Sequence, residues 1–564
     1  MDTRMNIFLL LDYKEYYGED KVLEDTLALL KDIPSITLIN YISGFSVNLY
    51  LQENSEHSGK IQRHLINNLV VRAGPEVIEK CKAELVKQIN KGHSPILFWS
   101  YSNLIFYGLI FRVYNELPSR DLTGEEAKKV LDAYLIINQY CNNKIKIGEG
   151  EIIKAEIDNK IEEVIMSNFI YQKDYASTTD FSNQVTRGAM FFEFLEQHNT
   201  YSVLVKEYYS SLNISGWLRM FKNLLTLFTE MKIDRTNEAR IQLADLYRYN
   251  KEEVDLPYID TLCVNSEIQN YREDTKFSLL RSKMLFKINS FQFFILSPNF
   301  LIDQFYKAQV FSFNSFLKQK GITNEFLSVK GKEFMEDIYL KRIFNYAFPS
   351  YEIHFGDTAL NSKNEELCDV YLRKDNKVAV IEFKDVLLND DVKNSADKEK
   401  LFNEFDIKFL KNQKKKQKGV TQLLNVVDEI ETRSISFDKS LPSGKIELFP
   451  IILYTDLSFG VEGFNKIFNE KFEKGNENKE FINLNLNSLT FINLNFFEIW
   501  EDYLKTDLMD IFVLLEEYHK HISNPDYQLT PFEVFSRFYM NKNVPQELGT
   551  TRHFRELTAR IIKA

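Results

Sequence analysis

Cysteine is scarce in this sequence, and the four residues present are scattered. Cys81, Cys141, Cys263 and Cys368 form no CxxC pair, which argues against a disulfide framework and against a thiolate zinc site. Proline and glycine are also few, at 12 and 20 of 564 residues, so collagen-like and low-complexity disordered classes are excluded. The apolar stretch 96–111 is shorter than the roughly 20 residues of a membrane span, and it predicts a buried helix.

The chain has fewer basic than acidic residues: it contains 70 Lys and Arg and 81 Asp and Glu, which gives a net charge of −11. Any contact with nucleic acid must therefore come from a local basic patch. With 44% hydrophobic and 27% charged residues the chain is globular, and at roughly 150 residues per domain its length predicts several domains. Residues 1–17 lack the long apolar segment of a secretory signal. Together with the scattered cysteines, this favours an intracellular, cytoplasmic location.

The first part of the chain is expected to be a small α/β segment covering 1–55. It begins with an apolar run at 7–11, continues with a helical stretch at 19–31, and then has a second strand-like run at 35–51. Beyond it the pattern becomes helical.

Residues 56–324 predict a mainly helical recognition or regulatory region, because their apolar residues recur mostly three to four positions apart. One helix start within this region has a clear signal. Thr123 is followed three positions later by Glu126, just before an apolar periodic run, and this is the arrangement of a capping box.

A change of pattern near 325 predicts a separate α/β domain covering 325–500, followed by a helical C-terminal segment at 501–564. The domain is expected to start with an amphipathic helix at 330–348. The strand-like runs lie at 351–355, 367–373, 377–386, 445–456 and 489–497, and a helix is expected at 419–433.

The second and third of these runs predict a hairpin that brings charged residues together. They meet at Asp375 and Asn376, a pair that tolerates the positive φ of a two-residue turn. In that register Asp369 lies directly opposite Glu382, and Lys384 lies on the same face as Glu382 because side chains alternate along a strand. Two carboxylates about 5 Å apart are destabilising unless a cation lies between them. A hard divalent ion such as Mg²⁺, or Mn²⁺ in its place, is the expected occupant.

With these residues the sequence resembles the PD-(D/E)xK nuclease superfamily, which includes many restriction endonucleases and repair nucleases. The resemblance covers about 330–460 and depends on Asp369, on Glu382 and Lys384 as the ExK motif, and on the element order. It implies an α/β fold with a restriction-endonuclease-like core (helix, three strands, helix, strand), in which helices flank a mixed sheet. It also implies that Asp369 and Glu382 bind the metal and that Lys384 orients or activates the attacking water.

Further residues are assigned by the same resemblance. Cys368 stands where the family usually has proline, a departure that the family tolerates. Many members add a glutamate from the first core helix, and here Glu333 and Glu336 compete, with Glu336 preferred. Some members carry a polar residue on the helix after the ExK strand, which points to Gln422. For each of these, an ordinary solvated or surface role is the open alternative.

A lysine-rich segment precedes that helix. Residues 408–418 (KFLKNQKKKQK) contain six lysines in eleven positions and no acid. Next to a phosphodiester-cleaving centre, such a segment would attract backbone phosphates through counterion release. A charge run taken alone is equally typical of a solvated surface. The lysines expected to contact nucleic acid are Lys411, Lys414, Lys415, Lys416 and Lys418.

The resemblance implies a Mg²⁺-dependent (endo)deoxyribonuclease acting on DNA rather than RNA, and analogy suggests the effector of a bacterial restriction or anti-phage defence system. A non-catalytic nucleic-acid-binding or scaffolding protein that keeps the fold is the alternative. The helical region could associate with a second copy or with a protein partner, and no membrane partner is expected. The sequence contains no GxxxxGK[ST], HExxH or GxSxG motif, which disfavours P-loop, zinc-protease and serine-hydrolase chemistry.

Overall fold

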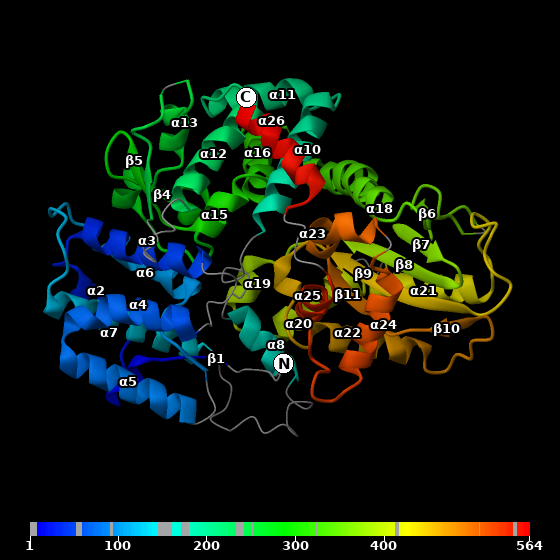
Figure 1. The fold of residues 1–564 in the computed structure, drawn as a ribbon, viewed down its shortest axis with the longest axis horizontal. Coiled ribbons are helices and arrows are strands. Elements are labelled where there is room, and N and C mark those ends of the chain that lie inside the picture. Colours follow the sequence, from blue (N-terminus) through cyan, green and yellow to red (C-terminus); the bar gives the residue numbers. More distant parts are fainter. Residues whose placement is uncertain are drawn as a thin grey trace. The chain divides into compact units, whose positions relative to one another are not determined.

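The computed structural model describes residues 8–51, 59–90, 94–144, 161–170, 180–232, 242–250, 252–322, 325–361, 363–411, 417–506, 508–544 and 550–563. These residues form two compact units (Figure 1). The helical unit contains the described residues of 8–144, 170–322 and 557–563. The α/β unit contains 161–169 and the described residues of 325–556. A large helical N-terminal region is thus followed by a mixed α/β region.

Helices dominate the helical unit, and its strands are short. The helices are α1 (Tyr13–Tyr17), α2 (Asp25–Leu30), α3 (Ser35–Leu51), α4 (Gly59–Ala73), α5 (Pro75–Asn90), α6 (Ser100–Arg112), α7 (Gly124–Asn143), α10 (Phe181–Gln197), α11 (Ser202–Ser211), α12 (Trp217–Lys232), α13 (Leu256–Thr261), η2 (Asn265–Asn270), α14 (Ser278–Ser282), α15 (Pro298–Asp303) and α16 (Lys307–Gln319). The strands are β1 (Phe8–Leu10) and β2 (Ser94–Ile96), which pair in parallel, and the antiparallel set β3 (Leu243–Asp245), β5 (Gln292–Ile295) and β4 (Leu285–Lys287).

The strand predicted at 35–51 is wrong, because these residues form helix α3. The run is rich in β-branched and aromatic residues, which suggested a strand, but at 17 residues it is much longer than an ordinary strand. In the helix, Leu38, Ile42, Phe45 and Leu49 are all buried, and their spacing of three to four is that of one helical face. Length and spacing together therefore outweigh local β propensity here.

The buried helix expected within 96–111 is confirmed. Helix α6 begins at Ser100, and all eleven residues of 101–111 are buried. None of the described helices is both long and apolar enough to cross a membrane.

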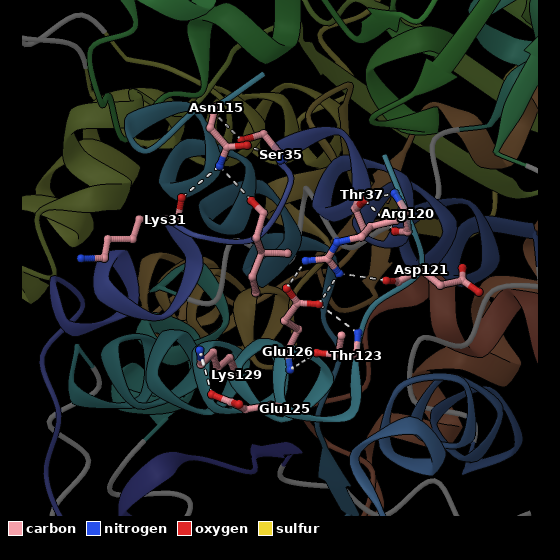
Figure 2. A network of polar contacts seen from close by, with 11 residues as sticks. Lys31, Ser35, Thr37, Asn115, Arg120, Asp121, Thr123, Glu125, Glu126 and Lys129 are labelled. Carbon is pink, nitrogen blue, oxygen red and sulfur yellow. Dashed lines mark hydrogen bonds and ion pairs between the residues drawn. The ribbon is translucent and has the colours of Figure 1, made fainter. Parts of the chain in front are cut away.

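The loop between α6 and α7 is fastened by a polar network (Figure 2). Thr123 and Glu126 form the expected capping box, with the Thr123 N–H donating to Glu126 Oε2 at 2.9 Å and the Glu126 N–H donating to Thr123 Oγ1 at 3.3 Å. The Arg120 guanidinium donates to both oxygens of Glu126, at 2.6 and 2.7 Å. Thr37 of α3 exchanges hydrogen bonds with the main chain of Arg120, at 2.8 and 3.1 Å. The loop is therefore tied to both α3 and α7.

A six-stranded mixed sheet forms the centre of the α/β unit. Its strands are β6 (Glu352–Phe355), β7 (Val370–Lys374), β8 (Lys377–Lys384), β9 (Ile446–Tyr454), β10 (Leu484–Leu486) and β11 (Thr490–Asn493). The order is β10-β9-β8-β7-β6, and β11 also pairs with β9. The pairs β6–β7 and β7–β8 are antiparallel, whereas β9 is parallel to β8, β10 and β11.

Proline 450 explains why two short strands share one edge of β9. Strand β10 pairs with β9 at 446–448, and β11 pairs with it at 451–454. Pro450 lies between these two pairings and has no N–H to donate to a neighbouring strand. The outer edge of β9 is therefore interrupted at this position, while its pairing with β8 is continuous.

Helices cover both faces of the sheet. The helices of this unit are α8 (Ile161–Ile170), α17 (Phe326–Val329), the π-helix η3 (Lys330–Leu340), α18 (Lys341–Ala347), α19 (Asp390–Asn394), α20 (Lys398–Phe409), α21 (Val420–Glu431), η4 (Leu457–Phe459), α22 (Phe464–Asn476), α23 (Asn495–Leu504), α24 (Ile511–Ile522) and α25 (Phe532–Asn543). Helix α26 (Arg552–Lys563) begins in this unit, and its residues from 557 onward belong to the helical unit. Val380 and Ile452 belong to a buried apolar cluster with residues of α20, α21 and α22. Phe449, which points to the opposite face of β9, packs against Phe512 of α24.

Most of the elements expected between 330 and 456 are present. The helix at 330–348, the first four strands and the helix at 419–433 correspond to η3 with α18, to β6–β9 and to α21. The expected strand at 489–497 is only partly correct, because β11 ends at Asn493 and α23 begins at Asn495. The short strand β10 was not foreseen.

Candidate active site

The hairpin of β7 and β8 has the expected register. Lys374 pairs with Lys377, and Asp375 adopts a left-handed φ of 54° in the loop between them. The ladder continues along β7 in the same register. Asp369, the residue before β7, therefore lies opposite Glu382 near the end of β8.

Three charged side chains meet at this end of the hairpin. The Phe383 N–H donates to Asp369 Oδ2 at 2.6 Å, which fixes the Asp369 carboxylate beside β8. Lys384 Nζ donates to Glu382 Oε2 at 2.8 Å. The side chains of Glu382 and Lys384 are only 4% and 13% exposed, so this is a buried ion pair. The structure thus brings together Asp369, Glu382 and Lys384, as the sequence predicted.

Burial and mutual charge shift the ionisation of this group. The pKa of the Glu382 carboxyl is raised, mainly because burial disfavours its charge, with a further contribution from Asp369. Burial also opposes the charge of Lys384, but the negative charges of Glu382 and Asp369 outweigh it and raise the pKa of Lys384. The raised pKa therefore favours the protonated form of Lys384.

The first helix of the α/β unit adds Glu336. This residue lies on η3, and π-helices are rare in proteins and frequent at functional sites. Glu336 is half-buried, accepts from Lys332 Nζ at 2.8 Å, and has its pKa raised by burial and then by the charge of Asp369. Glu333 is exposed. Glu336 interacts electrostatically with both Asp369 and Lys384.

Glu366 also belongs to this cluster, and sequence reasoning missed it. Its pKa is raised by burial of the carboxyl group and then by the charge of Asp369. It contributes to the electrostatic surroundings of Lys332 and Glu382 as well. Glu366 precedes β7 in a polar loop without periodicity, so the only signal in the sequence was its position three residues before Asp369.

Comparison of the chain with family models, with curated proteins and with solved structures gave no match. The function of the site is therefore inferred from its own geometry.

The remaining predicted residues lie elsewhere or outside the described chain. Gln422 is in the first turn of α21, where its Oε1 accepts the Gly419 N–H at 2.7 Å and so caps the helix. Lys411 is exposed, and Lys418 is half-buried. The other three lysines of the expected phosphate-binding set lie outside the described residues; they are Lys414, Lys415 and Lys416.

The donor set suits a hard divalent cation bound by few protein ligands. Asp369 and Glu382 present carboxylate oxygens, the ligands that Mg²⁺ and Mn²⁺ prefer. In the described part of the chain, no three or more His, Cys, Asp or Glu side chains are grouped so that they could hold a metal ion. A cation held by two carboxylates that keeps waters and binds substrate phosphate, as Mg²⁺ commonly does, fits this arrangement.

Proposed function

We propose that the α/β unit is a metal-dependent nuclease that hydrolyses phosphodiester bonds in DNA, with Mg²⁺ or Mn²⁺ held by Asp369 and Glu382. One observation carries the proposal. The hairpin register sets Asp369 opposite Glu382, and a buried lysine is paired with that glutamate at the same end of the strands. The restriction-endonuclease-like core suggested by the sequence motif remains part of this proposal.

The residues of the site have distinct roles in such a reaction. A bound divalent cation would polarise the phosphate and lower the pKa of a water molecule. Asp369 and Glu382 bind the cation, and the hydrogen bond from Phe383 keeps the Asp369 carboxylate in place. Lys384, already protonated, donates hydrogen bonds to the attacking water or to the charge that develops on phosphate. The negative charges of Glu382 and Asp369 raise the pKa of Lys384, which suits this role as a cationic donor.

The substrate and biological setting extend this proposal. Lys411 and Lys418, which are the two described lysines of the expected phosphate-binding set, would contact backbone phosphates and so contribute affinity without sequence specificity. The helical unit would recognise a trigger, a partner or a second copy. A large sensing region joined to a DNA-cutting unit suits an effector of bacterial restriction or anti-phage defence, a suggestion that depends on analogy.

A second candidate function is nucleic-acid binding or scaffolding without catalysis. Two observations favour it: no three-ligand metal group is present among the described residues, and the Lys384 amine is already bonded to Glu382. In that case Asp369, Glu382 and Lys384 would be a buried structural network.

The experiment that separates the two is cleavage of linear, circular and single-stranded DNA, and of RNA, by the full chain with Mg²⁺, Mn²⁺ or EDTA. Asp369→Asn and Lys384→Gln are compared with Asp375→Asn, a matched control at the other end of the same hairpin, where asparagine also tolerates the left-handed φ. A nuclease cuts only with metal, loses at least about 100-fold in rate in both site variants, and is unaffected in the control. Binding of DNA without cutting, unchanged in all variants, would establish the scaffolding function instead.

A further inference from the structure

We propose that Asp385 is a positioning residue of the candidate site, which fixes the end of strand β8 and thereby holds Lys384 in place. The inference rests on the proposed function, because Asp385 acts through Lys384 and does not touch the substrate. Asp385 lies outside the D…ExK motif and directly follows its lysine.

The end of β8 is the part of the strand that needs such an anchor. Lys384 is the last residue of β8, and it pairs with Tyr454, the last residue of β9. The chain then continues from 385 to 389 without helix or strand. Strand ends open more readily than strand centres, because fewer buried contacts and hydrogen bonds hold them. A displacement of about 1 Å within an active site can lower the rate about 100-fold, so the position of a lysine at a strand end has to be fixed by further contacts.

Both oxygens of the Asp385 carboxylate have a partner. Lys330 Nζ, at the start of η3, donates to Asp385 Oδ2 at 2.5 Å, and Thr455 Oγ1 donates to Asp385 Oδ1 at 2.9 Å. The side chains of Lys330 and Asp385 are only 11% and 17% exposed, so water screens their attraction less than it would at the surface. Thr455 is the residue that follows β9. Asp385 therefore joins the end of β8 to the end of β9 and to the start of η3.

The same segment is bonded a second time, three residues further on. The Leu388 N–H donates to Asp456 Oδ2 at 3.0 Å, and Leu388 belongs to the buried apolar cluster of the α/β unit. The residues after β8 are thus bonded to the residues after β9 at two successive points, first at 455 and then at 456. Side-chain bonds continue the contact between the two strands beyond the end of their ladder.

The bond from Lys330 also fixes the helix that carries the candidate glutamate. Helix η3 begins at Lys330 and includes Glu336. The pair of Lys330 and Asp385 therefore connects the start of this helix to the residue next to Lys384. Loss of the pair would loosen the two elements that supply Lys384 and Glu336.

A lysine–aspartate pair at the other end of the hairpin provides a matched control. Lys374, beside the turn, pairs with Asp510 Oδ2 at 3.0 Å, and their side chains are 33% and 27% exposed. Asp510 Oδ1 also accepts the Phe512 N–H at 2.9 Å as the N-cap of α24. Asparagine is as good an N-cap as aspartate. Asp510→Asn therefore removes a comparable ion pair from the hairpin at the end away from Lys384.

The test is steady-state cleavage of DNA by the full chain with Mg²⁺. Asp385→Asn and Lys330→Met should each lower kcat by about 10-fold or more, with the KM for DNA unchanged. Lys330→Arg keeps a cation for Asp385 and should restore a kcat near wild type. The double variant Asp385→Asn, Lys330→Met should lose no more than either single variant, because both changes break the same contact. Asp510→Asn should cut like wild type.

Hydrogen–deuterium exchange measures the position of the strand end without any cleavage. In Asp385→Asn, peptides covering 380–389 should exchange about 10-fold faster than in wild type, while peptides covering 370–378 should exchange at the wild-type rate. Thr455→Val removes one bond and leaves the ion pair intact, so it should cause a smaller change at the same peptides. Unchanged thermal unfolding of Asp385→Asn would show that the loosening is local.

The outcomes separate this inference from the proposed function. If wild type cuts and Lys384→Gln does not, but Asp385→Asn and Lys330→Met keep the wild-type kcat, the nuclease stands and the positioning role is refuted. If Asp385→Asn raises the KM for DNA and leaves kcat unchanged, Asp385 serves DNA binding and the positioning role is again wrong. If wild type cuts no DNA, or Lys384→Gln cuts equally well, the proposed function fails and this inference fails with it.

Discussion

Asp369 Oδ2 accepts the main-chain N–H of Phe383 at 2.6 Å. Phe383 lies between the two charged residues of the ExK motif and is itself buried. The bond therefore gives Asp369 a structural role, satisfying a buried donor, in addition to its proposed role as a metal ligand.

Two substitutions separate these roles. Asp369→Asn keeps a carbonyl oxygen for the Phe383 N–H and should change the free energy of unfolding little, while removing the charge that binds a cation. Asp369→Ala leaves a buried N–H without an acceptor and should cost about 1–3 kcal/mol. Chemical denaturation measures the stability of both variants, and calorimetric titration with Mn²⁺ measures their metal binding. Equal stability of the two variants would contradict the structural role.

The ion pair of Lys384 and Glu382 predicts strong energetic coupling. Because both side chains are buried, Lys384→Met leaves a carboxyl group without its cation and should destabilise the protein by about 3 kcal/mol. Adding Glu382→Gln removes the carboxyl group that has lost its partner, so the double variant should lose less stability than the sum of the two single losses. A double-mutant cycle in urea measures this difference. Strictly additive losses would show that the two residues do not interact.

The register of the site could be predicted because its information is local. A two-residue turn at Asp375 and Asn376 and the alternation of side chains were sufficient to set Asp369 opposite Glu382. By contrast, Glu366 lies against Gly356, and the two are brought together by the pairing of β6 with β7 and by a bridge between Leu360 and Glu366. No local sequence pattern indicates such a contact.

The assignment of segments to units was also beyond local reasoning. Residues 161–169 lie within 56–324, the region predicted to be mainly helical, yet they belong to the α/β unit. Their periodicity is that of any amphipathic helix, and the partner surface on α20 is more than 200 residues away in sequence. Hydropathy can indicate that a face is buried, but it does not indicate against what.

Helix α8 should therefore contribute to the stability of the α/β unit. Phe169 is buried, and its ring lies 5.3 Å from that of Phe405 on α20. Glu162 and Glu163 of α8 pair with Lys398 at 3.0 and 3.3 Å. Phe169→Ala should lower the unfolding free energy by about 3 kcal/mol, measured by denaturant titration. The control Glu162→Gln alters only an exposed ion pair and should change it by less than about 1 kcal/mol.

The same contacts predict the behaviour of a truncated chain. A fragment of residues 325–564 lacks α8 and exposes the apolar surface that Ile165 and Phe169 cover. It should melt at a lower temperature than the α/β unit of the full chain, or aggregate. Equal melting temperatures would show that α8 is dispensable.

His519 should make the α/β unit sensitive to mild acid. Its Nε2 shares a hydrogen bond with Thr490 Oγ1 at 2.8 Å, and its Nδ1 has no hydrogen-bond partner among the described residues. Burial lowers the pKa of His519 to about 4, against 6.5 for a free histidine. The unfolded state therefore binds a proton that the folded state rejects between these two pH values, and stability falls as the pH drops through that window.

Between pH 7.5 and pH 5 the free energy of unfolding should fall by on the order of 2 kcal/mol. Urea unfolding midpoints at the two pH values measure this change. His519→Gln keeps a polar group for Thr490 but cannot be protonated, so its midpoint should shift less over this range. His64→Gln on α4, in the helical unit, is the matched control and should leave the pH dependence of the α/β unit as in wild type. If His519→Gln and wild type lose stability equally, other groups cause the acid sensitivity, and the folded state accepts a proton on His519 without penalty.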